Sequence, residues 1–141
     1  MKKILSFIMV ASLVVLCLCL TSCDKAEDNA NLWADALYTE DTELGNGEKT
    51  VIVEVAAEDK SVTFTIKTDK ETVGAALEEH NLVSGEKGPY GLYVKVVNGI
   101  TADYDANQSD WSFNKDGEYM QTGVDVTEFS DGDHYELVYT K

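Results

Sequence analysis

Four oxygen-bearing side chains in one acidic loop come closest to the spacing of a known metal site. They are Asp103, Asp105, Asn107 and Asp110. Carboxylate and amide oxygens at alternate positions are the first ligands of a calcium-binding loop. The match then ends, because the sixth position carries Gln108 instead of glycine and the twelfth carries Asn114 instead of glutamate. A looser calcium site at these four residues stays open, beside the alternative of a solvated acidic loop.

Histidine-dependent catalysis finds little support in the sequence. The chain has two histidines, His80 and His134, and neither has a nucleophile at a characteristic spacing. Nucleophilic catalysis needs a nucleophile, a base and an orienting group within hydrogen-bond reach. A zinc site of cysteines and histidines needs more ligands than the chain offers after Cys23. Pairs of carboxylates carry no information in a chain with 26 acidic residues. We therefore expect a protein that is not an enzyme.

Aromatic side chains gather in the middle of the chain. The stretch contains Tyr90, Tyr93, Tyr104, Trp111, Phe113 and Tyr119. Trp111 and Phe113 alternate along an extended segment, so they share one face of it. Two interpretations follow. The two rings form part of a core beneath a helix, or they form an exposed platform on which a flat ligand or a partner stacks.

The elements that position these residues begin with a hairpin. The segments Thr50–Val55 and Ser61–Lys67 alternate and are rich in β-branched residues, which predicts two strands joined by a short corner. Helical spacing then takes over between Thr68 and Leu82. Thr68 or Asp69 could cap this helix with Glu71 completing a capping box, and Thr72 is the alternative cap.

Further strands follow the helix. The pattern predicts strands over 92–97, 111–114, 118–121 and 134–139. Asn98-Gly99 and Asp116-Gly117 are turn dipeptides that tolerate positive φ and close hairpins. The expected fold class is α+β, with a single helix packed on a small mixed sheet in a β-grasp-like arrangement. The sequence shows no internal repeat and no second domain.

The N-terminus has the pattern of a secretory signal. A basic start at Lys2 and Lys3 precedes an apolar run, and Leu20-Thr21-Ser22-Cys23 resembles a bacterial lipobox. We therefore expect a signal peptide over 1–22, and a lipidated N-terminus with an acidic tether over 23–49. Two acyl chains on Cys23 would give stable anchoring. An uncleaved membrane helix is the alternative. Within the tether, Leu32-Trp33 is expected to pack against the domain, because exposure of a tryptophan side chain to water is energetically unfavourable.

Charge restricts the class of partner. Cleavage before Cys23 removes two lysines and changes the formal net charge from −15 to −17, and the chain has no arginine. A strongly negative field repels phosphate backbones, which argues against nucleic acid. Without arginine the chain has no planar guanidinium group that could bind an anion through two parallel hydrogen bonds. The ligand is therefore expected to be neutral or cationic, or to be held by stacking and backbone groups.

Several motifs together resemble a known family. They are Thr72–Leu77, Gly91–Val94 with Val97–Ile100, Trp111-x-Phe113 with Asp116-Gly117-Glu118, Gly123-Val124, and Asp131-Gly132-Asp133 before a final strand. This order resembles the transcobalamin-like C-terminal domain family of bacterial surface lipoproteins, over residues 50–141. The resemblance implies a fold similar to the smaller domain of vertebrate cobalamin carriers, which caps one side of the corrin ring. It implies ligand contacts at Trp111, Phe113, Asn114 and Gly117, with Tyr119 beside them.

These observations combine into one expectation and one alternative. We expect a lipid-anchored extracytoplasmic module that binds a small flat ligand, with cobalamin or a related corrinoid as the candidate. The opposite, helical half of the cobalamin carriers has no counterpart in this sequence. The alternative is a cell-envelope protein–protein interaction module without a small ligand, which docks through its acidic surface or an edge strand.

Overall fold

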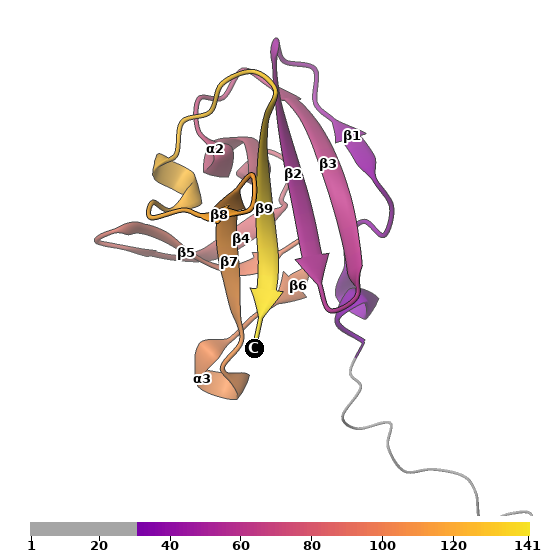
Figure 1. Ribbon diagram of the computed structural model, residues 1–141, viewed down its shortest axis with the longest axis vertical. Coiled ribbons are helices and arrows are strands. Elements are labelled where there is room, and N and C mark those ends of the chain that lie inside the picture. The colour runs from indigo at the N-terminus through magenta and orange to yellow at the C-terminus, as the bar shows by residue number, and fades with distance from the viewer. Residues whose placement is uncertain (1–30) are drawn as a thin grey trace, which may run out of the picture. The chain divides into compact units, whose positions relative to one another are not determined.

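The longest strands of the fold, β2 (Lys49–Ala57) and β3 (Lys60–Thr68), form an antiparallel hairpin (Figure 1). Alternate residues of both strands are buried, and Val53 lies opposite Phe64. Burial on one face is what the alternating pattern predicts, so the predicted hairpin is confirmed. This computed structural model describes residues 31–141. Cys23, the predicted signal peptide and the first part of the predicted tether lie outside the described residues.

A mixed six-stranded sheet grows from this hairpin. Its order is β1-β3-β2-β9-β7-β8, where β1 is Thr42–Leu44, β7 is Asp110–Lys115, β8 is Glu118–Tyr119 and β9 is Asp133–Thr140. β9 runs parallel to β2 and antiparallel to β7. β1 runs parallel to β3. The last strand of the chain therefore lies inside the sheet, between β2 and β7, as Figure 1 shows.

A second sheet contains two strands that the sequence pattern did not predict. It has the order β4-β5-β6, with β4 at Val83–Gly88, β5 at Gly91–Val97 and β6 at Ile100–Thr101. β5 and the Asn98-Gly99 hairpin turn agree with the prediction. β4 was missed because five of its six residues are exposed and it contains two glycines, so it shows no apolar alternation.

The predicted helix over 68–82 is wrong in length. The helix α2 spans Val73–Glu78, and its cap is Thr72, whose side chain accepts a hydrogen bond from the Ala75 amide at 3.2 Å. Thr68 is instead the last residue of β3. The described part of the chain also contains a second short helix, α3 (Tyr104–Asn107), and two 3₁₀ helices, η2 (Leu32–Asp35) and η3 (Val124–Val126). The domain is thus a small β-rich fold with mixed sheets and few helices.

The end of the tether packs against the domain. Trp33 is 5% exposed, and its Nε1 donates to the Ala57 carbonyl at 3.1 Å. The side chain of Asn98 makes two hydrogen bonds with the backbone of Tyr38. It accepts from the Tyr38 amide at 2.9 Å and donates to the Tyr38 carbonyl at 2.8 Å. The predicted packing of Leu32-Trp33 is confirmed, and the compact unit runs from Leu32 to Lys141.

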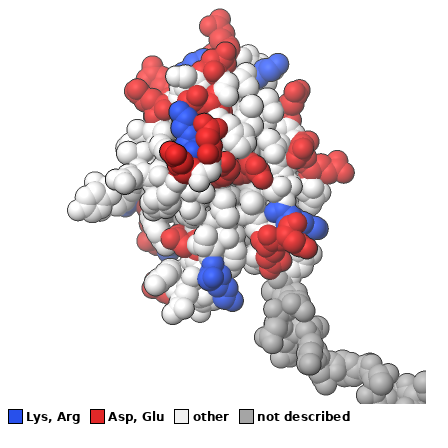
Figure 2. Space-filling view, viewed as in Figure 1, with Lys and Arg blue, Asp and Glu red and all other residues white. Residues whose placement is uncertain are grey.

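Acidic side chains dominate the surface. Figure 2 shows Asp and Glu spread over the face in view, with few lysines among them. Several of these carboxylates bind backbone amides: Asp131 accepts from Thr50 at 2.6 Å, and Asp41 accepts from Thr63 at 2.9 Å. None of the described helices is long and apolar enough to cross a membrane.

The side chain of Asp133, at the start of β9, accepts hydrogen bonds from three donors. Its Oδ2 accepts from the Ser130 amide at 2.9 Å, from Lys115 Nζ at 3.2 Å and from the Tyr135 hydroxyl at 3.3 Å. The hydrogen bond from the Ser130 amide is the main cause that lowers the pKa of Asp133 below its ordinary value, and Lys115 lowers it further. Burial acts in the opposite direction but does not cancel these effects. The ionised carboxylate therefore stabilises the folded state.

We expect Asp133→Asn to reduce the free energy of unfolding at neutral pH and to flatten its decline in acid. The folded-state pKa lies below the unfolded value of about 3.9. The stabilisation is therefore present above that pH and is lost as pH falls through the folded-state pKa. Urea unfolding at neutral pH and in steps below about pH 4 measures this effect. The exposed Asp59, at the β2–β3 turn, provides the control Asp59→Asn. Equal acid dependence in both variants would contradict the prediction.

Candidate functional site: an aromatic pocket

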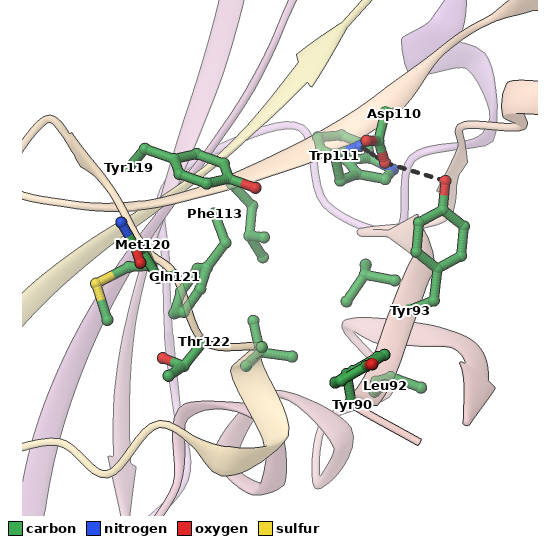
Figure 3. A pocket seen from close by; sticks show the side chains of 14 residues that line it. Tyr90, Leu92, Tyr93, Asp110, Trp111, Phe113, Tyr119, Met120, Gln121 and Thr122 are labelled. Atoms are coloured by element: carbon green, nitrogen blue, oxygen red, sulfur yellow. Dashed lines mark hydrogen bonds between the residues drawn. The ribbon is translucent and has the colours of Figure 1, made fainter. Parts of the chain in front are cut away.

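A pocket of about 320 Å³ opens between the β4–β5 hairpin and the β7–β8 edge of the large sheet. Figure 3 shows how its side chains converge from the two sides. The lining residues are Tyr90, Leu92, Tyr93, Val94, Asp110, Trp111, Phe113, Tyr119, Met120, Gln121, Thr122, Gly123, Val124 and Leu137. Aromatic rings with a few polar groups are typical of small-molecule sites.

Two buried rings on β7 contribute to the lining. Trp111 is 6% exposed and Phe113 is 8% exposed. Phe113 stacks on Tyr135 with ring centres 5.4 Å apart, and Trp111 meets Tyr139 edge-on at 5.6 Å. The core interpretation of this pair is therefore correct, and the exposed-platform interpretation is wrong. Both rings still border the pocket, so burial in the core and contact with the pocket coexist.

Three exposed tyrosines form the other rings. Tyr90, at the tip of the β4–β5 hairpin, is 94% exposed, Tyr119 of β8 is 73% exposed, and Tyr93 of β5 is 44% exposed. The described residues include six exposed large hydrophobic side chains, and three of these line this one pocket. Grouping of exposed rings around one concavity indicates a binding surface, since single exposed hydrophobics are otherwise scattered.

Asn114 and Gly117, also implied as ligand contacts, lie outside the pocket lining. Asn114 accepts a hydrogen bond from the Ser112 hydroxyl at 3.2 Å. Gly117 has φ +84° in the β7–β8 turn, and its amide donates to Glu136 at 3.0 Å. Their role is to close the hairpin that carries Tyr119. Sequence reasoning missed the wall formed by Met120–Thr122, which carries no distinguishing pattern.

The four acidic-loop residues are largely engaged in local structure. Asp103 caps α3, with its Oδ1 accepting from the amides of Asp105 at 3.0 Å and Ala106 at 3.3 Å. Asn107 accepts from both the amide and the hydroxyl of Ser109. No group of three or more His, Cys, Asp or Glu side chains in residues 31–141 could hold a metal ion. Of the four, Asp110 alone lines the pocket.

Asp110 joins the two sides of the pocket. Its Oδ1 accepts from the Trp111 amide at 2.8 Å and from the Tyr93 hydroxyl at 3.3 Å, the contact drawn as a dashed line in Figure 3. Burial raises the pKa of Tyr93, and the negative charge of Asp110 and its hydrogen bond raise it further. Tyr93 therefore remains a neutral phenol that donates to Asp110 at physiological pH.

Gly91 allows the hairpin to approach η3. Its φ is +108°, and a Cβ at this position would lie 2.6 Å from Oδ1 of Asp125. That oxygen is buried and has no hydrogen-bond partner in the described part of the chain. A side chain at Gly91 would therefore be strained in its backbone and would also displace Asp125, next to the pocket residues Gly123 and Val124.

Comparison with known proteins identifies relatives in sequence and in structure. A family model described as "Domain of unknown function (DUF4430)" matches residues 70–141. No curated protein matches the chain.

The solved structures that are similar to this chain include the following two. A protein from Ruminococcus gnavus ATCC 29149, described as a "putative metal binding protein", is 41% identical with a TM-score of 0.63, covering 67% of this chain and 98% of that one. Haptocorrin in complex with Cbi is 14% identical with a TM-score of 0.53, covering 69% of this chain and 26% of that one. The second likeness concerns the fold alone, and it agrees with the transcobalamin-like resemblance.

We expect Gly91→Ala to lower the free energy of unfolding by about 1–3 kcal/mol, because a non-glycine residue is strained at this φ. Gly132→Ala is the matched control, since Gly132 has φ +89° and open space where a Cβ would lie. Urea unfolding of both variants separates backbone strain from the clash with Asp125. The clash predicts a larger loss at Gly91, and an equal loss at the two positions would contradict it.

Proposed function

Because the chain belongs to the DUF4430 family, we propose that it is a binding module for a small flat ligand, anchored outside the cytoplasm through a lipid on Cys23. The pocket carries this proposal. It combines the buried rings of Trp111 and Phe113 with the exposed rings of Tyr90 and Tyr119. Flat rings offer large contact area at low entropic cost, which suits a planar ligand.

The size of the pocket supports partial enclosure. At about 320 Å³ it lies at the lower end of the range of roughly 300–1,000 Å³ for small-molecule sites. A ligand the size of a corrinoid would be covered on one side and remain exposed on the other. Haptocorrin, whose fold is similar, is described in complex with Cbi. Cobalamin or a related corrinoid is therefore the first ligand to test, on a β-grasp-like domain that would cap one side of it.

Metal binding and catalysis are less well supported. The Ruminococcus gnavus relative is described as metal binding. In the present chain Asp103 and Asn107 already accept backbone hydrogen bonds. His134 has only carboxylates as charged neighbours, with Glu136 at 3.6 Å. No nucleophile is placed beside it by any hydrogen bond in the described residues. We therefore propose a binding protein that is not an enzyme.

One observation favours a second candidate, an interaction module for another envelope protein. The tip of the β4–β5 hairpin projects from the fold in Figure 1, and Tyr90 at this tip is 94% exposed. Figure 2 shows the projecting part as largely uncharged beside an acidic surface. A projecting aromatic tip is a suitable hot-spot residue for a protein partner.

We expect Tyr119→Ala to weaken corrinoid binding about two- to thirteenfold, the loss of one aromatic contact of roughly 0.5–1.5 kcal/mol. The mature domain is titrated with cobalamin and with cobinamide while tryptophan fluorescence and corrin absorbance are recorded. Tyr104→Ala is the matched control, because Tyr104 is a 59% exposed tyrosine that does not line the pocket.

The outcomes separate the two candidate functions. Binding that Tyr119→Ala weakens and Tyr104→Ala preserves supports the small-ligand function. Absence of any change at high ligand concentration excludes the corrinoid. Capture of an envelope protein that depends on Tyr90, without any effect of corrinoid, favours the interaction module.

The lipid anchor is tested separately. We expect Cys23→Ser to move the protein from the membrane fraction to the soluble fraction and to abolish labelling with a fatty-acid analogue, because the thioether to diacylglycerol needs the thiol. Two acyl chains give stable anchoring. Cys19→Ser, within the apolar run, is the control, and membrane retention of Cys23→Ser would show that another attachment holds the protein.

A further inference from the structure

We propose that the pocket is selective for an organic cation, a flat or compact apolar group that bears a positive charge. This preference rests on the binding function proposed above and specifies the chemical class of its ligand. It follows from three features of the lining formed by residues 31–141: Asp110 is its one charged residue, several aromatic rings border it, and it contains no lysine.

Asp110 provides the counter-charge. It is the one ionisable carboxylate among the lining residues, and it lies at the end of the pocket beside Trp111 and Tyr93 (Figure 3). Its Oδ1 accepts from the Trp111 amide and the Tyr93 hydroxyl. Its Oδ2 takes part in no hydrogen bond or ion pair in the described structure. The negative charge is therefore held in position by two donors and is not neutralised by a cation.

The rings supply a second attraction for positive charge. The face of an aromatic ring is electron-rich, and a cation above it is attracted more strongly when water is excluded. Trp111, the best ring type for this interaction, is buried at the pocket wall. Tyr93 and Tyr119 stand on opposite sides of the pocket in Figure 3. A carboxylate beside several rings is the chemistry that recognises substituted ammonium groups and delocalised cations.

None of the lysines in residues 31–141 lines the pocket. The charge of Lys95 acts on Tyr93 and lowers its pKa, but burial and Asp110 have the larger, opposite effect. Lys95, which follows the pocket residues of β5, is paired with Glu86 at 3.1 Å, and Lys115, which follows those of β7, is paired with Asp133 at 3.2 Å. The formal net charge of the full sequence, −15, has the same sign. An anionic ligand is therefore repelled at long range and meets no cation in the pocket.

Three flat probes of one size test the preference. They are N-methylquinolinium, which is a cation, quinoline, which is neutral, and quinoline-2-carboxylate, which is an anion. Binding is followed by proton–nitrogen NMR of the mature domain. The chain has two tryptophans, so the indole N–H signal of Trp111 reports on the pocket, while that of Trp33, which donates to Ala57, serves as an internal reference.

We expect N-methylquinolinium to bind about five- to thirtyfold more tightly than quinoline, from a desolvated cation–π contact. The anion should bind most weakly. Asp110→Asn should weaken binding of the cation about fivefold, as for loss of a partly exposed ion pair, and so reduce the ratio of cation affinity to quinoline affinity by about the same factor. Asp59→Asn is the matched control, because it removes one carboxylate that does not line this pocket.

The outcomes distinguish this inference from the binding function itself. If quinoline or its carboxylate binds as tightly as the cation, or if Asp59→Asn weakens the cation as much as Asp110→Asn does, cation selectivity is wrong and the pocket remains a ligand site. If none of the probes shifts the Trp111 signal, the cation preference is overturned, and corrinoid titration then decides whether the pocket binds anything.

Discussion

The parallel pairing of β9 with β2 is the constraint on which the rest of this structure depends. Parallel neighbours cannot be joined by a tight turn, so the chain between them has to cross over. In this protein the crossover carries α2, the second sheet and β7 before β9 inserts beside β2. β7 then pairs with β9, and Phe113 lies opposite Leu137. The pocket is the space left where the second sheet of the crossover faces the edge of the first.

Carboxylates in this protein have two kinds of role: they accept hydrogen bonds from backbone amides, or they line the pocket. Many satisfy backbone amides at turns and strand edges, as Asp131 does for Thr50 and Asp103 does for α3. This use explains why an acidic loop can imitate the start of a calcium site, since Asp and Asn are also the residues that cap helices and turns. Asp110 combines both roles, because it binds the Trp111 amide and also lines the pocket.

Sequence patterns were reliable where one face of a strand is buried. The β2–β3 hairpin, β7 and β9 follow alternation, because burial of every second residue gives the sequence a period of two. β5 was predicted from its β-branched and aromatic residues, although its burial does not alternate. The sequence pattern did not predict β4 or the length of α2. An exposed strand has no period of two, and a helix of under two turns is too short to show a clear helical period. In the site, Trp111, Phe113 and Tyr119 were named from the sequence, whereas Asn114 and Gly117 proved to shape the turn beside it.

The sequence by itself determined the acidic charge, the alternation of buried and exposed residues in the β2–β3 hairpin and the number of aromatic residues, and it predicts a secretory signal with lipidation at Cys23. These are local or additive properties, readable without knowing which segments meet. Only the tertiary structure decided that Trp111 is both buried and at a pocket wall, and that Tyr93 of β5 reaches Asp110 of β7. Such outcomes depend on contacts between segments far apart in the chain, whose register is set by the packing of whole sheets and leaves no periodic trace in either segment.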